Sequence, residues 1–374
     1  MKRLPVRSPF ILAGALLFFA SAAFAQTVAV GTCLPQLKTY STISQAVSSV
    51  TPGSTIDVCP GTYPEQVIIT QPLTLRGVQA GNADNATVTV PPGGLTKSVI
   101  APTNGATMFY QILVQGTESG MVNINNLAIN GSSTANSGLS GWIEGIYYQN
   151  SSGVVNGVTT KNQKGNGYGF GIFAEGTTSP AKTVAVRNSS VHDFDSEGIR
   201  TNGSVVPSLT VNITFNTVIS SSSFSGPAVY GGIDIQGAEG SIMNNRVITH
   251  PAPAGVSTGV GVAFPTDTTV IGNTVANFSV GVWALGTSNT IKSNQVSLAG
   301  SAIVLSASSN IVQNNFLFNL NGGAGISFNC TGTGNTVINN FVNDAFWGIV
   351  DPHGTNTISP NSFSNVTKVI SGPC

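Results

Sequence analysis

Charged residues are scarce in this chain. Only 7% of the residues are Asp, Glu, Lys or Arg, whereas an average soluble domain has roughly a quarter. The 14 basic residues are balanced by 14 acidic ones, which argues against nucleic acid as a partner, because phosphate binding needs a basic surface. The surface must therefore be kept soluble by Asn, Ser, Thr and Gly, and such a surface suits a neutral or polyhydroxylated ligand.

Long apolar runs are also missing beyond residue 25, so the sequence predicts no transmembrane segment. The first 25 residues resemble an export signal, with three basic residues, an apolar stretch over 10–23 and a small-x-small cleavage site at its end. Cleavage before Gln26 would leave 11 basic residues (14 minus three) against 14 acidic ones, a net charge of −3. We expect a soluble, monomeric protein that is secreted or periplasmic.

Cysteine and histidine are few, with four and three copies, and no His/Cys cluster has the spacing of a zinc site. All four cysteines follow the predicted export signal. An even number in an exported chain indicates disulfides, and three pairings are possible. We favour Cys33–Cys59 and Cys330–Cys374, because each bridge would fix one end of the folded chain.

A repeated pattern, aliphatic-x-x-Asn-x-apolar, dominates the second half of the chain. The seven asparagines are Asn216, Asn245, Asn273, Asn294, Asn315, Asn340 and Asn361, spaced 29, 28, 21, 21, 25 and 21 residues apart. A period in this range is typical of a solenoid. We expect these asparagines at turns, where Asn tolerates left-handed backbone and where stacked amides can bond from coil to coil.

A second series runs in phase with the asparagines and pairs a very small residue with a β-branched aliphatic. Its members are Gly145-Ile146, Gly171-Ile172, Gly198-Ile199, Gly232-Ile233, Gly261-Val262, Gly281-Val282, Ala302-Ile303, Gly325-Ile326 and Gly348-Ile349. Alternate residues of a strand face opposite sides of a sheet. The aliphatic residues are therefore expected to stack in the interior, coil upon coil.

One domain is expected over 26–374. Within it, residues 39–77 are predicted to form a cap and a first coil. The cap is a short amphipathic helix over 42–50, with apolar residues at 43, 46, 47 and 50. Irregular coils are expected over 78–120, regular coils over 121–365 and a C-terminal tail over 366–374. Strand pairing is predicted to be parallel throughout.

Four segments of the opening coil carry a family resemblance, together with the two later series. They are Tyr40-Ser41-Thr42-Ile43-Ser44-Gln45-Ala46-Val47, Pro52-Gly53-Ser54-Thr55-Ile56, Pro60-Gly61-Thr62-Tyr63 and Leu73-Thr74-Leu75-Arg76-Gly77. They resemble right-handed parallel β-helix proteins of the pectin-lyase-like superfamily over roughly 39–365. The resemblance implies an all-β fold, a single right-handed parallel β-helix of about nine to ten coils with a short N-terminal helical cap. It leaves the activity open, because the superfamily includes lyases, hydrolases, esterases, epimerases and proteins without known catalysis.

An outward face can be predicted from the Gly-aliphatic strands. The residue after each aliphatic should face outward, and so should the residue two positions further on. Since neighbouring coils lie about 4.8 Å apart, Arg200 and Asp234 could pair, with Glu175 one coil before. These three are the candidate catalytic residues. The candidate substrate-binding residues on the same face are Tyr147, Phe173, Asn202, Gln236 and Trp283, and the same rule places Ala263 between Asp234 and Trp283.

This face has two interpretations. Aromatic rings stack on sugar rings, carboxylates and Arg bind hydroxyls or carboxylates, and two carboxylates can perform general acid–base catalysis. The alternative is a surface ion pair among scattered aromatics, which is common and contributes little.

A second candidate site is the acidic segment before the Arg200 strand. Asp193, Asp195 and Glu197 are spaced i, i+2, i+4 and would share one side of an extended chain. Oxygen clusters of this kind suit Ca²⁺, the one cofactor that the sequence suggests. A solvated acidic turn is the alternative.

Two short motifs resemble those of catalytic families. Gly232-Ile233-Asp234-Ile235 is similar to part of the Gly-x-Val-Asp-Phe strand of pectin methylesterases, but that family's Gln-Asp and Leu-Gly-Arg-Pro-Trp motifs are missing. Asp351-Pro352-His353 is similar to the Asp-Pro-His-Asp motif of mannuronan epimerases, with Gly354 in place of the last Asp.

The sequence therefore predicts a secreted protein that binds or processes an extracellular or cell-wall polysaccharide, as a lyase or glycoside hydrolase if it is an enzyme. A non-catalytic, adhesin-like or accessory scaffold protein is the alternative. It is favoured by the small number of ionisable groups and by the lack of a complete catalytic motif.

Overall fold

The structure is a computed structural model that describes residues 24–79, 85–117, 120–136, 138–165, 167–204, 208–220, 230–250, 257–263, 267–320, 322–329, 332–352 and 354–371. Residues 1–23 of the predicted export signal lie outside this part. So do Cys330 and Cys374, and with them the second predicted disulfide. Among the described residues, no helix is both long and apolar enough to cross a membrane.

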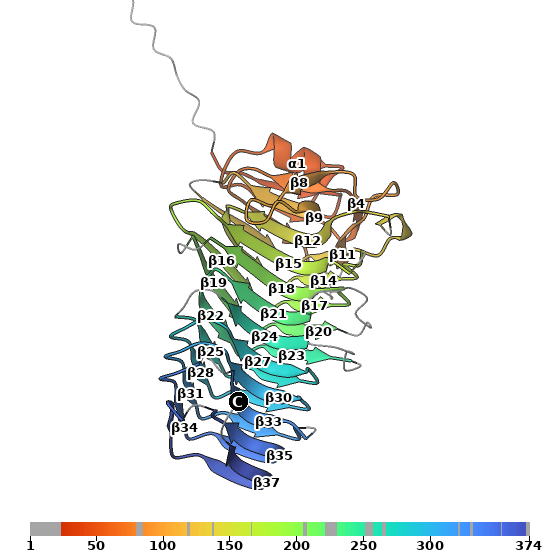
Figure 1. The fold of residues 1–374 in the computed structure, drawn as a ribbon. Helices are drawn as coiled ribbons and strands as arrows, with labels where there is room; N and C mark the ends of the chain where they lie inside the picture. Colours follow the sequence, from red (N-terminus) through yellow and green to blue (C-terminus); the bar gives the residue numbers. More distant parts are fainter. Residues whose placement is uncertain are drawn as a thin grey trace, which may run out of the picture.

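The chain winds into one long solenoid whose strands form three ladders (Figure 1). The first ladder contains, in order, β2 (Thr39–Tyr40), β1 (Thr27–Val30), β3 (Thr55–Val58), β6 (Leu73–Gly77), β10 (Met121–Asn125), β13 (Ser152–Asn156), β16 (Lys182–Arg187), β19 (Leu209–Thr214), β22 (Glu239–Met243), β25 (Thr269–Ile271), β28 (Thr290–Lys292), β31 (Ile311–Gln313), β34 (Thr336–Ile338) and β36 (Thr357–Ile358).

The second ladder contains β4 (Gly61–Pro64), β7 (Ala86–Thr89), β11 (Ala128–Asn130), β14 (Thr159–Lys161), β17 (Ser190–His192), β20 (Thr217–Ser220), β23 (Arg246–Thr249), β26 (Thr274–Ala276), β29 (Gln295–Ser297), β32 (Phe316–Phe318) and the start of β35 (Phe341–Val350). The third ladder contains β5 (Val67–Ile69), β9 (Thr107–Gln115), β12 (Trp142–Gln149), β15 (Gly169–Gly176), β18 (Glu197–Gly203), β21 (Tyr230–Gln236), β24 (Ser257–Ala263), β27 (Val280–Ala284), β30 (Ser301–Leu305), β33 (Ala324–Phe328), β35 and β37 (Ser362–Ser371).

Two predictions need correction, one on the number of coils and one on the direction of strand pairing. The twelve strands of the third ladder just named exceed the nine to ten coils expected, because residues 78–120 and 366–371 also supply strands of the stack. Pairing is parallel except at one place, where β8 (Ser98–Ile100) runs antiparallel to β9. This hairpin carries residues 98–106, which we call the arm, out over the outer face of the third ladder.

The N-terminal end is closed as predicted. Helix α1 (Ile43–Ser49) starts after Thr42, whose side chain accepts a hydrogen bond from the Gln45 N–H, and Glu65 accepts bonds from two more amides of the first turn. The helix lies at one end of the stack in Figure 1 and covers its apolar interior. A disulfide joins Cys33 to Cys59 at the same end, which confirms that pairing.

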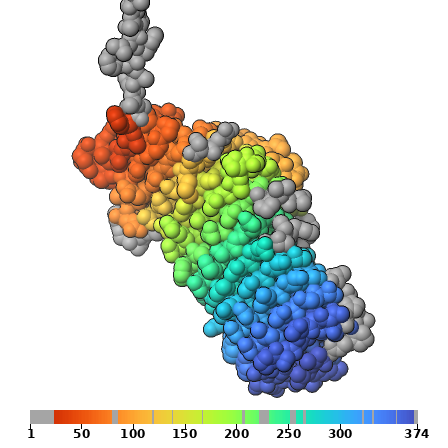
Figure 2. Space-filling view, turned by 90° about the vertical axis from the view of Figure 1, so that its left-hand side faces the viewer, coloured from red at the N-terminus to blue at the C-terminus, as the bar shows by residue number. Residues whose placement is uncertain are grey.

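The space-filling view shows the body as one elongated stack along which the sequence colours follow one another (Figure 2). Each coil therefore packs chiefly on the coils before and after it, as in other solenoids. The interior is lined by the aliphatic residues of the Gly-aliphatic series: Ile199, Ile233 and Val282 are at most 1% exposed, as predicted.

The glycines of this series explain a break in strand alternation. A Cβ atom on Gly198 would lie 2.4 Å from Cγ1 of Val218, and one on Gly232 would lie 2.1 Å from Cγ1 of Val247. The glycine and the aliphatic that follows it thus both face the interior. The residue before each glycine, such as Glu197, consequently faces outward, which a strict period of two does not predict.

This packing can be tested by adding one methyl group. Gly232→Ala is expected to lower the free energy of unfolding by about 1–3 kcal/mol, because the new atom overlaps Val247 and lies 2.7 Å from the Gly259 carbonyl. Gly138→Ala is the control, since no described residue other than its chain neighbours lies within 4 Å of the added atom. Urea denaturation measures both. Equal stability of the two variants would contradict the proposed close packing.

The asparagine ladder runs through the turn between the first and second ladders. Asn245 accepts hydrogen bonds from both the backbone and side-chain N–H of Asn216, and it donates in the same way to Asn273. This confirms the predicted bonding between coils. The left-handed residue, however, is the one before the ladder member in six of the seven repeats, as at Phe215 (φ 57°) and Asn244 (φ 56°).

A second asparagine ladder precedes the strands of the first ladder and was not anticipated. It consists of Asn289, Asn310, Asn335 and Asn356. Both ladders satisfy buried turn amides that have no strand partner.

Candidate functional site

Three columns of side chains run along the outer face of the third ladder, in register from strand to strand. The first column is Glu197, Gly231 and Thr258. The second is Arg200, Asp234, Gly261 and Trp283. The third is Asn202, Gln236, Ala263 and, in the next coil, Leu285. Within each strand the three column residues are spaced i, i+3 and i+5, because the glycine at i+1 and the aliphatic residue at i+2 both face the interior.

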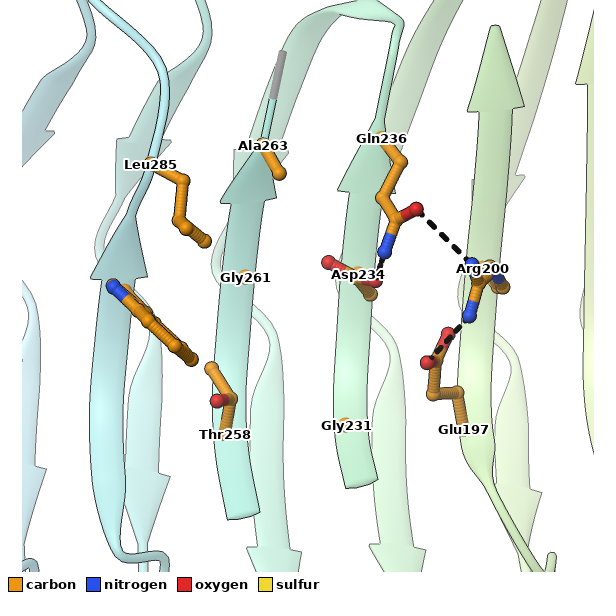
Figure 3. A pocket seen from close by; sticks show the side chains of 10 residues that line it. Glu197, Arg200, Gly231, Asp234, Gln236, Thr258, Gly261, Ala263 and Leu285 are labelled. Carbon is orange, nitrogen blue, oxygen red and sulfur yellow. Dashed lines mark hydrogen bonds and ion pairs between the residues drawn. The ribbon is translucent and has the colours of Figure 1, made fainter. Parts of the chain in front are cut away.

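The columns enclose a pocket of about 280 Å³. One side is polar and is formed by Glu197, Arg200, Asp234 and Gln236, and the other side includes Ala263 and Leu285 (Figure 3). Trp283, which is paired with Gly261 in the register, belongs to this second side. Gly231 and Gly261 leave the floor without side chains. A Cβ atom on Gly261 would lie 2.5 Å from Oδ1 of Asp234, so glycine is needed there for the carboxylate to keep its place.

The register differs from the prediction in one strand. Ile233 pairs with Val260, and Asp234 with Gly261, so the repeat unit of β24 begins at Gly259 and not at Gly261. A shift of two residues keeps the same face outward. Ala263 therefore lies in the third column, beside Gln236, and the second column has a gap at Gly261 that deepens the pocket.

A chain of hydrogen bonds links the polar side chains. Arg200 donates from Nη1 to Glu197 Oε1 at 2.8 Å and from Nη2 to Gln236 Oε1 at 3.0 Å. Gln236 then donates from Nε2 to Asp234 Oδ2 at 2.7 Å. Arg200 and Asp234, predicted to pair directly, are thus joined through Gln236.

The Arg200 guanidinium is held from behind by two aromatic rings. Its Cζ atom lies 5.3 Å from the ring centre of Trp142 and 5.7 Å from that of Phe170. Cation–π contacts of this kind hold a guanidinium in place when it is shielded from water. The side chain is only 14% exposed.

Burial controls the protonation of the carboxyl groups. It raises the pKa of Glu197 to about 8, with Arg200 opposing the rise and Asp234 adding to it. It also raises the pKa of Asp234, against the effect of Arg200 and Gln236. At neutral pH, Glu197 therefore holds a proton that it can donate.

Glu144 was not anticipated as part of this group. It lies in the first column, two strands before Glu197, and Phe170 occupies the same column on the strand between them. Its side chain is fully buried, and neither carboxyl oxygen has a hydrogen-bond partner among the described residues. Burial raises its pKa well above the usual value. Only the outward position of the residue before each glycine would have indicated it.

Four of the predicted catalytic and substrate-binding residues do not line the pocket. Tyr147 and Phe173 point outward from the solenoid but are fully buried in an aromatic cluster beside the arm. Glu175, also buried, accepts bonds from the Thr103 N–H of the arm at 2.7 Å and from the Tyr147 hydroxyl. Asn202 also contacts the arm, through Thr103. These side chains hold the arm in place, which the sequence could not show because the arm comes from residues 98–106.

The three carboxylates proposed for Ca²⁺ do not converge. Asp193 contacts His192, Asp195 accepts a bond from the Gly165 N–H, and Glu197 pairs with Arg200. Within the described ranges, no group of three His, Cys, Asp or Glu side chains is arranged to hold a metal ion. The prediction assumed an extended chain, but Asp193 has left-handed backbone (φ 58°) and the chain turns there.

Comparison with known families agrees with this architecture. The family model described as right handed beta helix region matches residues 170–342. The chain is a right-handed parallel β-helix protein. No curated protein matches it by sequence.

Several solved structures share this β-helix. The A-module of the mannuronan C-5 epimerase AlgE4 from Azotobacter vinelandii is similar with a TM-score of 0.64 and 13% identity, over 88% of this chain and 90% of that one. The lacto-N-biosidase of family GH136 from Eubacterium ramulus gives 0.62 and 12%, over 92% and 68%. The tailspike protein of E. coli bacteriophage HK620, solved with a pentasaccharide, gives 0.57 and 14%, over 88% of this chain and 62% of the tailspike. At such identities the likeness concerns the fold.

The epimerase-like tripeptide lies apart from the pocket of this β-helix protein. Asp351 follows β35, which lies three strands beyond the pocket strand β27 in the third ladder. Its carboxylate accepts a hydrogen bond from Asn356 Nδ2 at 2.9 Å. It therefore supports the end of the second asparagine ladder. His353 lies outside the described residues.

Proposed function

We propose that this pocket binds a sugar residue of an extracellular polysaccharide and promotes hydrolysis of its glycosidic bond. The observation that carries the proposal is the asymmetry of the pocket, in which an acid–amide–guanidinium chain faces an apolar wall that contains Trp283. A sugar ring has the matching asymmetry, since its C–H face stacks on an aromatic ring and its hydroxyls bind polar groups.

The chemistry follows from the two carboxyl groups. Glu197, with a pKa of about 8, donates its proton to the leaving glycosidic oxygen. Asp234 assists the attack of water on the other side of the bond, as the second carboxylate of glycosidases does. Arg200 and Gln236 are positioning residues that join the two groups.

Two further features support export. The Cys33–Cys59 disulfide is stable in an oxidising compartment, and the first 25 residues have the composition of an export signal. We therefore place the activity outside the cytoplasm.

Single substitutions on each wall test the proposal. Glu197→Gln is expected to reduce release of reducing ends from a neutral polysaccharide by about 10²–10⁴-fold, because the proton donor is lost. Trp283→Ala is expected to weaken binding of the same polymer by about tenfold, because a stacking platform is removed. Reducing-end assays and affinity electrophoresis measure the two effects.

The controls are Glu239→Gln and Phe316→Ala, which lie on other strands away from the pocket. Both should behave as the unaltered protein does. Binding without bond cleavage would favour a carbohydrate-binding scaffold over a hydrolase. Binding that none of the pocket variants changes would remove the pocket from the function.

A further inference from the structure

A second pocket lies on the outer face of the third ladder and encloses about 350 Å³. It is lined by two aromatic residues, Trp142 and Tyr168, by Ala106 and Thr107 at the base of the arm, and by residues 139–141. Trp142 begins β12, and Tyr168 comes directly before β15. The two pockets have no lining residue in common.

Trp142 lies between the two pockets. Its ring centre is 5.3 Å from Cζ of Arg200, which lines the first pocket, and 5.9 Å from the ring centre of Tyr168. It also packs on Phe170 at 5.0 Å, and Phe170 is the strand neighbour of Glu197. The second pocket is therefore next to the edge of the first pocket that Glu197 and Arg200 form.

The second pocket has the surface of a sugar-binding site. The rings of Trp142 and Tyr168 are stacked with 6° between their planes, and both are partly exposed, whereas Phe170 beneath them is 1% exposed. Exposed aromatic rings in a cavity offer a flat apolar surface to the C–H face of a sugar. Thr107 and Ser140 add hydroxyls, and the described lining residues include no charged side chain. Such a pocket can hold a sugar ring without reacting with it.

The proposed reaction indicates which sugar lies there. The ring that is cleaved lies on the Trp283 side of the first pocket, and Glu197 gives its proton to the leaving oxygen. Since Oε1 of Glu197 accepts a bond from Arg200, the proton of the neutral carboxyl lies on Oε2. The departing sugar carries that oxygen, so it lies beyond Glu197 on the side away from Trp283. This is the side of the second pocket, because β12 and β15 precede β18, whereas β27 follows it.

We infer that the pocket lined by Trp142 and Tyr168 is a second sugar-binding subsite, which holds the sugar residue on the leaving-group side of the cleaved bond. The inference rests on the proposed function and adds that an efficient substrate fills two subsites. Tyr168 is the residue to test. A change at Trp142 would also release the Arg200 guanidinium, which Trp142 helps to hold.

Two kinds of leaving group separate the subsites. We would assay the full chain on glucan, mannan, galactan, xylan and polygalacturonate, and on the α- and β-glycosyl fluorides of the same sugars. Water replaces the leaving group at the anomeric carbon in both cases, but a fluoride ion is too small to fill a sugar subsite. Tyr168→Ala is expected to lower kcat/KM about tenfold for the polymer that is cleaved, because a stacking surface is lost, and to change kcat/KM for the matching fluoride by less than about twofold.

Two control variants accompany this test. Tyr168→Phe keeps the ring and should act on both substrates as the unaltered protein does. Phe316→Ala removes a ring that is 43% exposed on β32, outside both pockets, and should also change neither activity. Thermal unfolding confirms that the variants are folded.

The outcomes are distinguishable. If Tyr168→Ala lowers kcat/KM equally for polymer and fluoride, or for neither, the second subsite is overturned and the proposed function stands. Cleavage of a polymer without any hydrolysis of its fluoride overturns the division into two subsites. Failure of the unaltered protein to cleave any polymer of the panel removes the proposed function, and this inference with it.

Discussion

Replacing Asn294 by alanine is expected to lower the free energy of unfolding by about 3–5 kcal/mol. The side chain is fully buried, and its Oδ1 atom accepts bonds from both the backbone N–H and the Nδ2 of Asn273 at 2.9 and 3.0 Å. Its Nδ2 donates to the Val270 carbonyl at 2.9 Å. Each buried group left without a partner costs about 1–3 kcal/mol.

Asn212→Ala is the matched control. Asn212 is exposed on β19 and accepts a bond from the Ser241 hydroxyl, so its loss should change stability by no more than about 0.5 kcal/mol. Urea denaturation followed by circular dichroism compares the two variants. Similar midpoints would show that the asparagine ladder contributes no more than a surface contact.

The second large effect concerns pH. The pKa of Glu197 is raised from 4.5 to about 8 in the folded chain. The unfolded chain therefore releases this proton at lower pH than the folded chain does. The stabilising contribution is complete below about pH 4.5 and is lost as the pH rises through 8, with a total on the order of 5 kcal/mol.

Glu197→Gln removes this titration and keeps an acceptor for Arg200. The variant should lose less stability than the unaltered protein between pH 5 and 9, in a series of thermal unfolding curves. A smaller slope remains, because burial also raises the pKa of Glu144 and of Asp234. Glu239→Gln should follow the unaltered protein. Parallel curves for Glu197→Gln and the unaltered protein would place the titrating group elsewhere.

The outer face was predicted correctly for Arg200, Asp234, Gln236 and Trp283, all of which line the pocket. The first column was missed, because the prediction assumed strict alternation. Glu197 was assigned to a metal-binding turn instead, although it lies on β18 and faces the pocket. The glycine that follows it has no room for a Cβ atom, and this steric fact is invisible in the one-letter pattern.

The sequence by itself determined the solenoid, because a coil of this size can bury its aliphatic residues and satisfy its turn amides only by stacking on identical neighbours. The regular spacing of the asparagines and of the Gly-aliphatic pairs in the sequence results from that requirement. Only the tertiary structure decided which outward side chains reach solvent. The arm comes from residues 98–106 and meets Glu175 and Asn202 far along the chain. Such a contact produces no repeated pattern in the sequence, because it occurs only once. The arm nevertheless decides that Tyr147 and Phe173 are buried, whereas Trp283 lines the pocket.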